Sequence, residues 1–299
     1  MKKIAIVTPT YNRSELLYRL YESLRDQICK DFKWLIIDDG SVDNTREVVQ
    51  MIIEEDKIEI EYYYINNGGK HRALNRAIEL CDNYMFFIVD SDDILPKESI
   101  QEIIYMDECV EEKIEYCGIS GLKASFNKKL LSNQFPNSAF DATSIELYYD
   151  YNIRGDKAEV FYTKVLKKYR FPEFEGEKYM TEAILWNKMA NDGYKIRWFD
   201  KIIYLGEYRE DGLTKKALEL SLNNSKGKSY FHNQESSFNI PFKWKIYHQS
   251  NYFRYGILSN YKIKDLYENS KCKSLAPFTI FIGASVICYT SIRLRFRRR

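Results

Sequence analysis

The first third of the chain alternates short apolar runs with amphipathic stretches, and each apolar run ends in a polar cluster. The runs are rich in β-branched and aromatic residues, whereas the stretches between them carry apolar side chains at helical spacing. This alternation predicts a mostly parallel sheet with right-handed crossovers and helices on its faces. The expected strands are residues 4–8, 32–37, 58–65 and 85–89. Because such sheets bind ligands outside the carboxyl ends of their strands, we expect the four polar clusters at one crevice.

The fourth run, Met85–Val89, is followed directly by the carboxylates of Asp90, Asp92 and Asp93. Neighbouring carboxylates repel one another and are costly to bury, so the cluster needs a cationic partner. Mg²⁺ and Mn²⁺ prefer oxygen ligands and often take one or two protein carboxylates together with substrate phosphate. The structural alternative is an acidic turn that caps a helix beginning near Pro96. The metal site is favoured because three other polar clusters are expected at the same edge.

Composition restricts the class of protein. The 299 residues include 45 basic and 43 acidic side chains, a formal net charge of +2, so we expect no nucleic-acid partner, although five arginines lie among the last seven residues. Six scattered cysteines without a Cys-x-x-Cys pair are expected to be reduced thiols. No apolar signal segment opens the sequence, and no Walker or dinucleotide-binding glycine loop is present. We expect a cytoplasmic α/β protein with either one large domain or a domain plus an appendage.

The polar clusters occur in a definite order and spacing. They are Thr8-Pro9-Thr10-Tyr11-Asn12-Arg13, Asp38-Asp39-Gly40-Ser41, Gly69-Lys70 with Asn75 in the following helix, and Asp90-Ser91-Asp92. In this combination the first 110 or so residues resemble the nucleotide-sugar half of a family-2 glycosyltransferase of the bacterial surface-polysaccharide type. The resemblance continues more loosely to about residue 215. It implies a GT-A fold, which is a Rossmann-like, mostly parallel sheet flanked by helices.

The resemblance also implies roles for single residues. The donor-binding residues that it implies are Thr8, Pro9, Tyr11, Arg13, Asp39, Lys70 and Asp90. Asp39 is expected to accept a hydrogen bond from a base such as uracil, and Asp92, with Asp90, to hold Mg²⁺ or Mn²⁺ on the diphosphate. Asp38 and Asp39 are alternatively a turn and helix cap, and Lys70 is alternatively a solvated loop lysine. Asp93 either contacts the sugar or caps a helix.

An inverting transfer also needs a base for the acceptor hydroxyl, and the second half of the chain must supply it. Glutamates at positions 173, 175, 177 and 182 precede an expected amphipathic helix. Glu182 is the favoured base because related enzymes carry a Glu-Asp pair near the start of this helix, although Ala183 replaces the aspartate here. Glu177 is the second candidate. The alternative for Glu182 is a helix N-terminal acid without chemistry.

Two later charged segments are further candidates. Arg154-Gly155-Asp156-Lys157 resembles an acceptor-side segment of bacterial polysaccharide transferases, although a structural turn explains it equally well. Residues 207–214, after an expected strand at 202–205, suit a lid over the diphosphate with Arg209 as a phosphate contact. An ordinary surface loop is the alternative for the second segment.

Strand signals cease near residue 215, so we expect a catalytic domain at 1–215 and a helical C-terminal region at 216–299. Within the catalytic domain, residues 1–110 form the nucleotide-sugar half and residues 111–215 the acceptor half. The dense aromatics of the C-terminal region suggest an interface with a bilayer, a lipid-linked acceptor or another subunit. Packing of these helices onto the catalytic core is the alternative.

Residues 275–292 carry no charge, and as a helix they reach roughly 27 Å, marginally short of a bilayer core. The arginines beyond them argue against a span, because basic residues tend to stay on the cytoplasmic side. A shallow or re-entrant anchor is favoured, in which Pro277 and Gly283 allow a bend and the arginines lie on anionic lipid headgroups, and a buried helix is the alternative.

The sequence thus predicts a metal-dependent inverting glycosyltransferase at the inner face of the cell membrane. It is expected to move sugar from a nucleotide-diphosphate donor, a UDP-sugar, to a lipid-linked oligosaccharide or surface-polysaccharide precursor. One alternative is a phosphotransferase with Asp90 as nucleophile. The other is a nucleotide-sugar-binding membrane protein without turnover. The sequence leaves the oligomeric state open.

Overall fold

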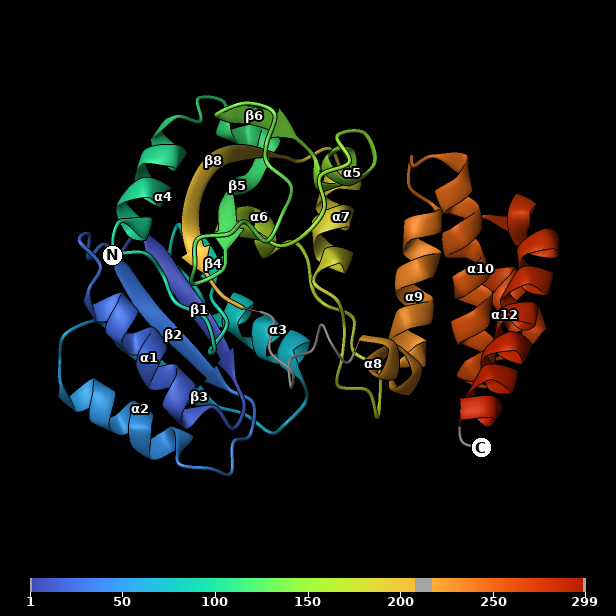
Figure 1. Cartoon of the computed structure of the whole chain (residues 1–299), viewed down its shortest axis with the longest axis horizontal. Coiled ribbons are helices and arrows are strands. Elements are labelled where there is room, and N and C mark those ends of the chain that lie inside the picture. The colour runs from blue at the N-terminus through green and yellow to red at the C-terminus, as the bar shows by residue number, and fades with distance from the viewer. Residues whose placement is uncertain (1, 208–216, 298–299) are drawn as a thin grey trace. The chain divides into compact units, whose positions relative to one another are not determined.

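The computed structural model describes residues 2–207 and 217–297, with side chains in the last helix described as far as residue 287. The described chain divides into two compact units. The first unit contains residues 2–171 and 185–207, and the second contains residues 172–184 and 217–297. The first unit holds the sheet, and the second is largely helical (Figure 1).

A single mixed sheet organises the first unit. Its strands are β1 (Ile4–Thr10), β2 (Phe32–Asp38), β3 (Ile60–Tyr64), β4 (Met85–Ile88), β5 (Tyr116–Ala124), β6 (Ala139–Ala142), β7 (Lys157–Tyr162) and β8 (Lys195–Leu205). Among the described residues these eight strands pair in the order β3-β2-β1-β4-β7-β5-β8-β6. β3, β2, β1 and β4 are parallel, as predicted, and β7 is antiparallel to both of its neighbours. β8 is parallel to β5, and β6 closes the edge in antiparallel register.

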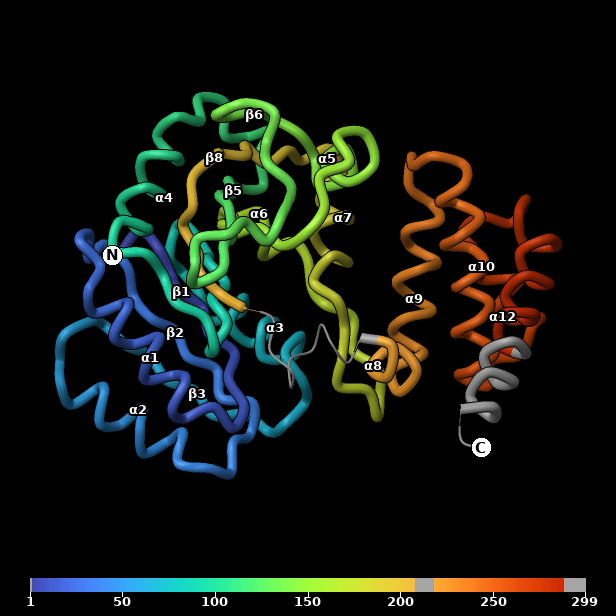
Figure 2. The backbone as a smooth tube through the Cα atoms, in the orientation of Figure 1, coloured from blue at the N-terminus to red at the C-terminus, as the bar shows by residue number. Residues whose placement is uncertain are grey.

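Helices α1 (Ser14–Arg25), α2 (Thr45–Glu54) and α3 (Lys70–Leu80) connect the parallel strands, and their path can be followed in Figure 2. α1 buries a leucine stripe at helical spacing, and α2 buries Val49 and Ile52. Both helices pack with alternate residues of the strands, such as Ile4, Ile6 and Trp34, in one apolar core. The chain moves outward from β1 to β3 and then returns to place β4 on the other side of β1. Right-handed crossovers therefore put α3 on the opposite face of the sheet.

This reversal positions the site. β2 and β4 lie on either side of β1, so the strand order changes direction between β1 and β4. A crevice is expected at the carboxyl ends of strands where such a reversal occurs. The segments that follow β1, β2 and β4 are the polar clusters singled out in the sequence.

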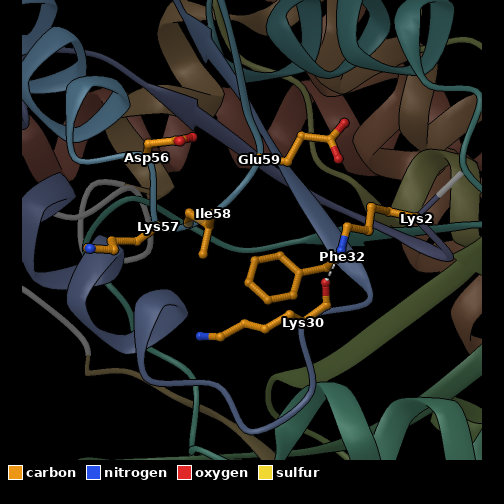
Figure 3. Close-up of a pocket in the computed structure, with 7 residues that line it drawn as sticks. All are labelled: Lys2, Lys30, Phe32, Asp56, Lys57, Ile58 and Glu59. Atoms are coloured by element: carbon orange, nitrogen blue, oxygen red, sulfur yellow. Dashed lines mark hydrogen bonds between the residues drawn. The ribbon is translucent and has the colours of Figure 1, made fainter.

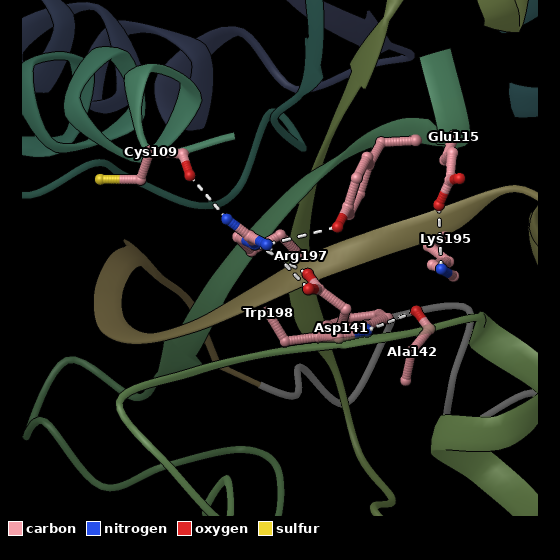
Figure 4. A network of polar contacts seen from close by, with 8 residues as sticks. Cys109, Glu115, Asp141, Ala142, Lys195, Arg197 and Trp198 are labelled. Carbon is pink, nitrogen blue, oxygen red and sulfur yellow. Dashed lines mark hydrogen bonds and ion pairs between the residues drawn. The ribbon is translucent and has the colours of Figure 1, made fainter. Parts of the chain in front are cut away.

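A polar network holds the far edge of the sheet (Figure 4). The Arg197 guanidinium donates two hydrogen bonds to Asp141, at 2.7 and 2.8 Å, and a third to the Cys109 carbonyl oxygen. The bidentate pair joins β8 to β6, and the bond to Cys109 joins β8 to the C-terminal end of α4 (Ser99–Glu108). The Asp141 carboxylate raises the pKa of Arg197. This network is structural and lies on strands remote from β1 and β2 in the sheet order.

The second unit contains α8 (Ala217–Asn223), α9 (Ser225–Ser236), α10 (Phe242–Leu258), α11 (Ile263–Asn269) and α12 (Ala276–Arg297). α10 packs against both α9 and α12. The aromatic residues of this region divide between two roles: Phe238, Tyr252, Phe253 and Tyr255 are buried, whereas Phe242 is 65% exposed. Both interpretations of the aromatics, internal packing and an outer surface, therefore describe part of the set.

α12 is one continuous helix from Ala276 to Arg297. Pro277 and Gly283 were expected to allow a bend, and the helix continues through both residues. Proline is tolerated in a first helical turn, and Gly283 serves close packing, because a Cβ there would lie 2.6 Å from the Ser250 carbonyl oxygen of α10. In the described part of the chain, no helix is both long and apolar enough to cross a membrane. Phe278 and Phe281 on the outer side of α12 are 59% and 74% exposed.

Candidate active site

The loop after β2 is tied to the loop before α3. The buried Asp39 carboxylate accepts hydrogen bonds from the backbone N–H groups of Gly68 at 2.7 Å and Gly69 at 2.8 Å. Gly40 adopts φ +82°, and a Cβ there would lie 2.8 Å from the Asn67 nitrogen, so glycine is required at this approach. Asp39 is thus an anchor for the Gly-Gly-Lys loop, a contact that the turn and cap alternative did not include.

Asp38 has a structural environment of its own. Its buried carboxylate accepts hydrogen bonds from the Ser41 backbone N–H at 2.7 Å and from the Tyr62 hydroxyl at 2.6 Å. Burial first, and then the charge of Asp38, raise the pKa of Tyr62, so its hydroxyl keeps its proton. The turn that the sequence offered as an alternative for Asp38 is therefore present.

The loops after β1 and β2 are also bound to each other. The Asn12 backbone N–H donates to the Ser41 hydroxyl at 2.9 Å, and the Asn12 side-chain oxygen accepts from the Val42 backbone N–H at 2.9 Å. Asn12 has a positive φ of 52°, a conformation that asparagine tolerates better than most residues. Neither Asn12 nor its partners stood among the predicted site residues. The signal in the sequence was an asparagine, a residue that tolerates the left-handed conformation, within a polar loop.

The predicted nucleotide-bordering residues of β1 and of the segment after it differ in exposure. Thr8 is fully buried, and its hydroxyl accepts a hydrogen bond from the Trp34 indole N–H at 2.9 Å. Pro9 is buried and Arg13 half-buried, whereas Tyr11 is 47% exposed. The Thr10 hydroxyl was not predicted, yet it is buried without a hydrogen-bond partner among the described residues.

Lys70 and Asp90 form a direct ion pair, with 2.6 Å between Nζ and Oδ1. The pair joins the first residue of α3 to the segment after β4. Burial favours the neutral acid, but the charges of Lys70 and Lys123 outweigh it and hold the pKa of Asp90 below its ordinary range. The sequence placed both residues at the donor site, and the structure brings them into contact.

Asp92 is half-buried, and its backbone is held from α1. The Arg19 guanidinium donates to the Asp92 carbonyl oxygen and lies over the Phe126 ring, 4.9 Å from its centroid. Arg19 lies on a helix whose apolar stripe gave no indication of this contact, so sequence reasoning missed it.

Asp93 lies in a buried network. Its Oδ2 atom accepts hydrogen bonds from Lys123 Nζ of β5 and from the Tyr204 hydroxyl of β8, both at 2.8 Å. Burial, together with the nearby charge of Asp90, raises the pKa of Asp93 to about 6 despite Lys123. A Cβ at Gly206 would lie 2.0 Å from Asp93 Oδ1, so this position needs glycine. Asp93 therefore joins the strands β5 and β8 and neither caps a helix nor offers an open carboxylate.

The two candidate bases lie in the second unit and differ in environment. Glu182 is half-buried and directly precedes α7 (Ala183–Asn191), at the helix start where it was expected. Glu177 is only 7% exposed, and its carboxylate accepts hydrogen bonds at 2.7 Å from the backbone N–H groups of Lys226 and Gly227. Glu177 thus caps the N-terminus of α9, which is a structural role.

The segment from Arg154 to Lys157 enters the sheet at β7. Val160 pairs with Phe87 of β4 in antiparallel register, so Lys157 begins its strand near the end of β4. Lys157 Nζ donates to the Gly155 carbonyl oxygen at 2.9 Å, and burial lowers the pKa of Lys157. This neighbourhood agrees with an acceptor-side position and with a structural turn. Arg209, the predicted phosphate contact, lies outside the described residues.

The carboxylates after β4 are the candidate ligands for a metal ion. The described residues hold no group of three or more His, Cys, Asp and Glu side chains arranged around one ion position. Asp93 is committed to Lys123 and Tyr204. Asp90, which pairs with Lys70 through Oδ1, and Asp92 are the other two carboxylates of this segment. Two carboxylates suit a hard divalent ion that takes its other ligands from substrate phosphate and water.

A pocket of about 330 Å³ lies at the other edge of the sheet, where β1 and β2 begin (Figure 3). It is lined by Lys2, Lys30, Phe32, Asp56, Lys57, Ile58 and Glu59. Lys2 Nζ donates to the Lys30 carbonyl oxygen at 2.7 Å, as Figure 3 shows. The pocket lies at the amino ends of the strands and is therefore separate from the candidate site at their carboxyl ends.

Comparison with known proteins identifies the family. The profile of Glycosyl transferase family 2 matches residues 5–162, just over half of the chain. The GalNAc(5)-diNAcBac-PP-undecaprenol beta-1,3-glucosyltransferase of Campylobacter jejuni is 26% identical over 318 residues, covering 96% of this chain and 94% of the relative.

Solved structures agree on the fold. S. aureus TarS 1-349 in complex with UDP-GlcNAc matches with a TM-score of 0.59 at 17% identity, covering 94% of this chain and 89% of that one. The mannosyltransferase PcManGT from Pyrobaculum calidifontis, in complex with GDP-Man and Mn2+, matches with a TM-score of 0.51 at 14% identity, covering 97% and 75%. With the family match and the strand-end clusters together, the chain belongs to glycosyl transferase family 2 and is a glycosyltransferase with the GT-A fold.

Proposed function

We propose that the protein transfers a sugar, with inversion, from a nucleotide-diphosphate donor of the UDP-sugar class to a hydroxyl of a lipid-linked or surface-polysaccharide acceptor. The supporting observation is the contact between Lys70 and Asp90 at the edge where β1, β2 and β4 end. Names of similar proteins support the substrate classes. The C. jejuni relative is named a glucosyltransferase of a PP-undecaprenol compound, and the TarS structure holds UDP-GlcNAc.

In this proposal the loops after β1 and β2 bind the nucleotide. Tyr11 and Arg13, with the backbone of Thr8 and Pro9, border the nucleoside, and Asp39 accepts a hydrogen bond from the base. The Asn12 and Asp39 contacts support this role because they fix the loops relative to one another before a ligand arrives. Preformed loops spare the donor the entropic cost of ordering them.

Asp90 and Asp92 would hold a Mg²⁺ or Mn²⁺ ion together with the donor diphosphate. Such an ion, when bound, stabilises the negative charge that develops on the departing nucleoside diphosphate. Lys70 supports the same charge from α3, and its ion pair with Asp90 keeps its ammonium group at this edge. The Mn2+ in the PcManGT complex supports the choice of ion class.

Glu182 is our candidate for the base. It takes the proton from the acceptor hydroxyl while the acceptor oxygen forms its bond to the anomeric carbon. The bond from that carbon to the diphosphate oxygen breaks, and the electron pair leaves with the nucleoside diphosphate. The capping role of Glu177 supports this choice between the two glutamates.

We propose further that residues 216–299 associate with the inner face of the cell membrane, and that residues 1–215 form the catalytic domain. The exposed Phe278 and Phe281 on α12, with the basic residues at its flanks, suit a shallow position at a lipid surface. Family membership argues against both alternatives considered from the sequence, a phosphotransferase with Asp90 as nucleophile and a binding protein without turnover.

The experiment is a panel of UDP- and GDP-sugars with Mn²⁺, in which release of nucleoside diphosphate is measured. Asp92→Ala should lower the rate at least about a hundredfold, since electrostatic stabilisation of the leaving group is lost. Asp82→Ala is the matched control, because Asp82 is an exposed aspartate that precedes β4 and lies at its other end. Activity that survives both Asp92→Ala and chelation contradicts the metal-dependent mechanism.

A further inference from the structure

Tyr204 was not among the residues predicted from the sequence, yet its hydroxyl contacts both ends of the loop of residues 90–93. The Asp90 backbone N–H donates to Tyr204 Oη at 2.9 Å, and Tyr204 Oη donates to Asp93 Oδ2 at 2.8 Å. One hydroxyl thus accepts at one end of the loop and donates at the other, which uses its single proton and one lone pair. The loop residues 90–93 are bridged from β8 by this contact.

The environment of Tyr204 makes this bridge rigid. Tyr204 is 4% exposed, and its ring packs edge-on against Phe87 of β4. Lys123 Nζ lies over this ring, 4.3 Å from the centroid. Removing the hydroxyl leaves buried polar groups without this partner, and such groups are costly.

A second contact holds the same loop from α1. Arg19 of α1 donates to the Asp92 carbonyl oxygen, while Tyr204 of β8 binds the Asp90 amide. The two residues come from elements far apart in the chain and meet the loop on either side of Ser91. Between these contacts lie the two carboxylates assigned to the donor diphosphate.

We propose that Tyr204 and Arg19 are positioning residues, which fix the backbone of residues 90–92 so that both carboxylates are preset for the ion and diphosphate of the donor. This inference rests on the proposed function and states what holds the two carboxylates in place. Carboxylates held before binding need no ordering when the donor arrives, so their affinity depends on the two backbone contacts.

The test measures binding of UDP and GDP to the full-length protein by calorimetry, with and without Mn²⁺, and Mn²⁺ binding by electron paramagnetic resonance. Tyr204→Phe should raise the dissociation constant of the Mn²⁺-nucleotide complex about tenfold, because a buried hydrogen bond to a charged group is lost. Arg19→Lys keeps the charge but loses the planar donor group, and should weaken the same binding severalfold. In turnover, both variants should raise KM for the donor as well as lower kcat.

Tyr21→Phe is the matched control for lost hydroxyl bonding. Tyr21 is fully buried, stacks on Trp34, and donates its hydroxyl to Glu55 Oε2 at 2.7 Å, between α1 and α2. It loses the same type of bond, so its melting temperature reports the cost of the hydroxyl alone. When the two variants have similar melting temperatures, Tyr204→Phe should weaken Mn²⁺-nucleotide binding and Tyr21→Phe should leave it unchanged.

The outcomes separate two failures. Wild-type protein that binds neither UDP nor GDP with Mn²⁺ overturns the proposed donor site and, with it, the positioning role. Wild-type binding that persists unchanged in Tyr204→Phe and Arg19→Lys overturns the positioning role alone. If Tyr204→Phe does not fold, Arg19→Lys decides the matter by the same measurement, because Arg19 is only half-buried.

Discussion

Replacing Glu177 by glutamine tests whether this residue is a helix cap or a base. The carboxylate accepts two backbone hydrogen bonds of 2.7 Å at the start of α9 and is 7% exposed. An amide keeps one acceptor oxygen and turns its NH₂ group toward the other backbone N–H. Hydrogen bonds to a charged group contribute about 1.5–3 kcal/mol each, so Glu177→Gln should destabilise the first turn of α9 by about 2 kcal/mol.

The neighbouring contacts make this effect local. The Asn224 side-chain oxygen accepts from the backbone N–H groups of Lys178 and Tyr179, so the loop and the helix start bind each other in both directions. A Cβ at Gly227 would lie 2.8 Å from the Met180 methyl carbon and 3.1 Å from Glu177 Oε2, which leaves little space for adjustment. We therefore expect the lost bond to appear as opening of α9.

Hydrogen exchange measured by mass spectrometry reads this opening directly. A loss of about 2 kcal/mol should speed exchange of the Lys226 and Gly227 amides about thirtyfold, while peptides of α1 serve as an internal control. Glu175→Gln is the matched variant, because Glu175 is exposed in the same loop. Transfer activity of folded Glu177→Gln should match wild type. Unchanged exchange together with lost activity would refute the capping argument and make Glu177 the base.

Three further predictions concern the base, the helical unit and the membrane. Glu182→Gln should keep donor binding and lower kcat by about 10²–10⁴-fold, and a normal rate would remove it as the base. Burial, and then the charge of Lys228, lower the pKa of His248 to about 4. The pKa of His232 is lowered well below 6.5, and the Nδ1 atoms of the two histidines lie 2.9 Å apart. The unfolded chain therefore binds more protons than the folded chain as pH falls below 6.5. Denaturation measured at several pH values should show that the free energy of unfolding falls by about 2 kcal/mol through His248 by pH 5, and His248→Gln should reduce this dependence on pH. A free energy of unfolding of the wild type that does not change with pH contradicts this prediction. Phe278→Ser with Phe281→Ser should reduce binding to vesicles containing anionic lipid by at least about tenfold, with Ile114→Ser as the exposed apolar control, and unchanged binding would remove α12 as the contact.

The order of strands in the first half could be derived from the sequence because it depends on local patterns. Apolar runs such as Met85–Val89 and the helical spacing in α1 specify their elements over a few residues. The connection rules then arrange these elements as a parallel sheet, and the reversal beside β1 follows from the chain order. The pairing of Lys70 with Asp90 at one edge agrees with that derivation.

The second half could not be derived in this way, because its strands do not pair in chain order. β7 inserts between β4 and β5, and β8 pairs with both β5 and β6. Only this arrangement brings Lys123 and Tyr204 to Asp93, which the sequence left between two other roles.

The sequence by itself determined the strand-end carboxylates and the family, because both depend on residue types at short spacing. The tertiary structure decided what each carboxylate contacts: Asp39 the Gly-Gly loop, Asp93 the pair from β5 and β8, and Glu177 the start of α9. These partners lie between 29 and 111 residues away along the chain. Contacts at such separations follow from packing of whole elements, which no local pattern specifies.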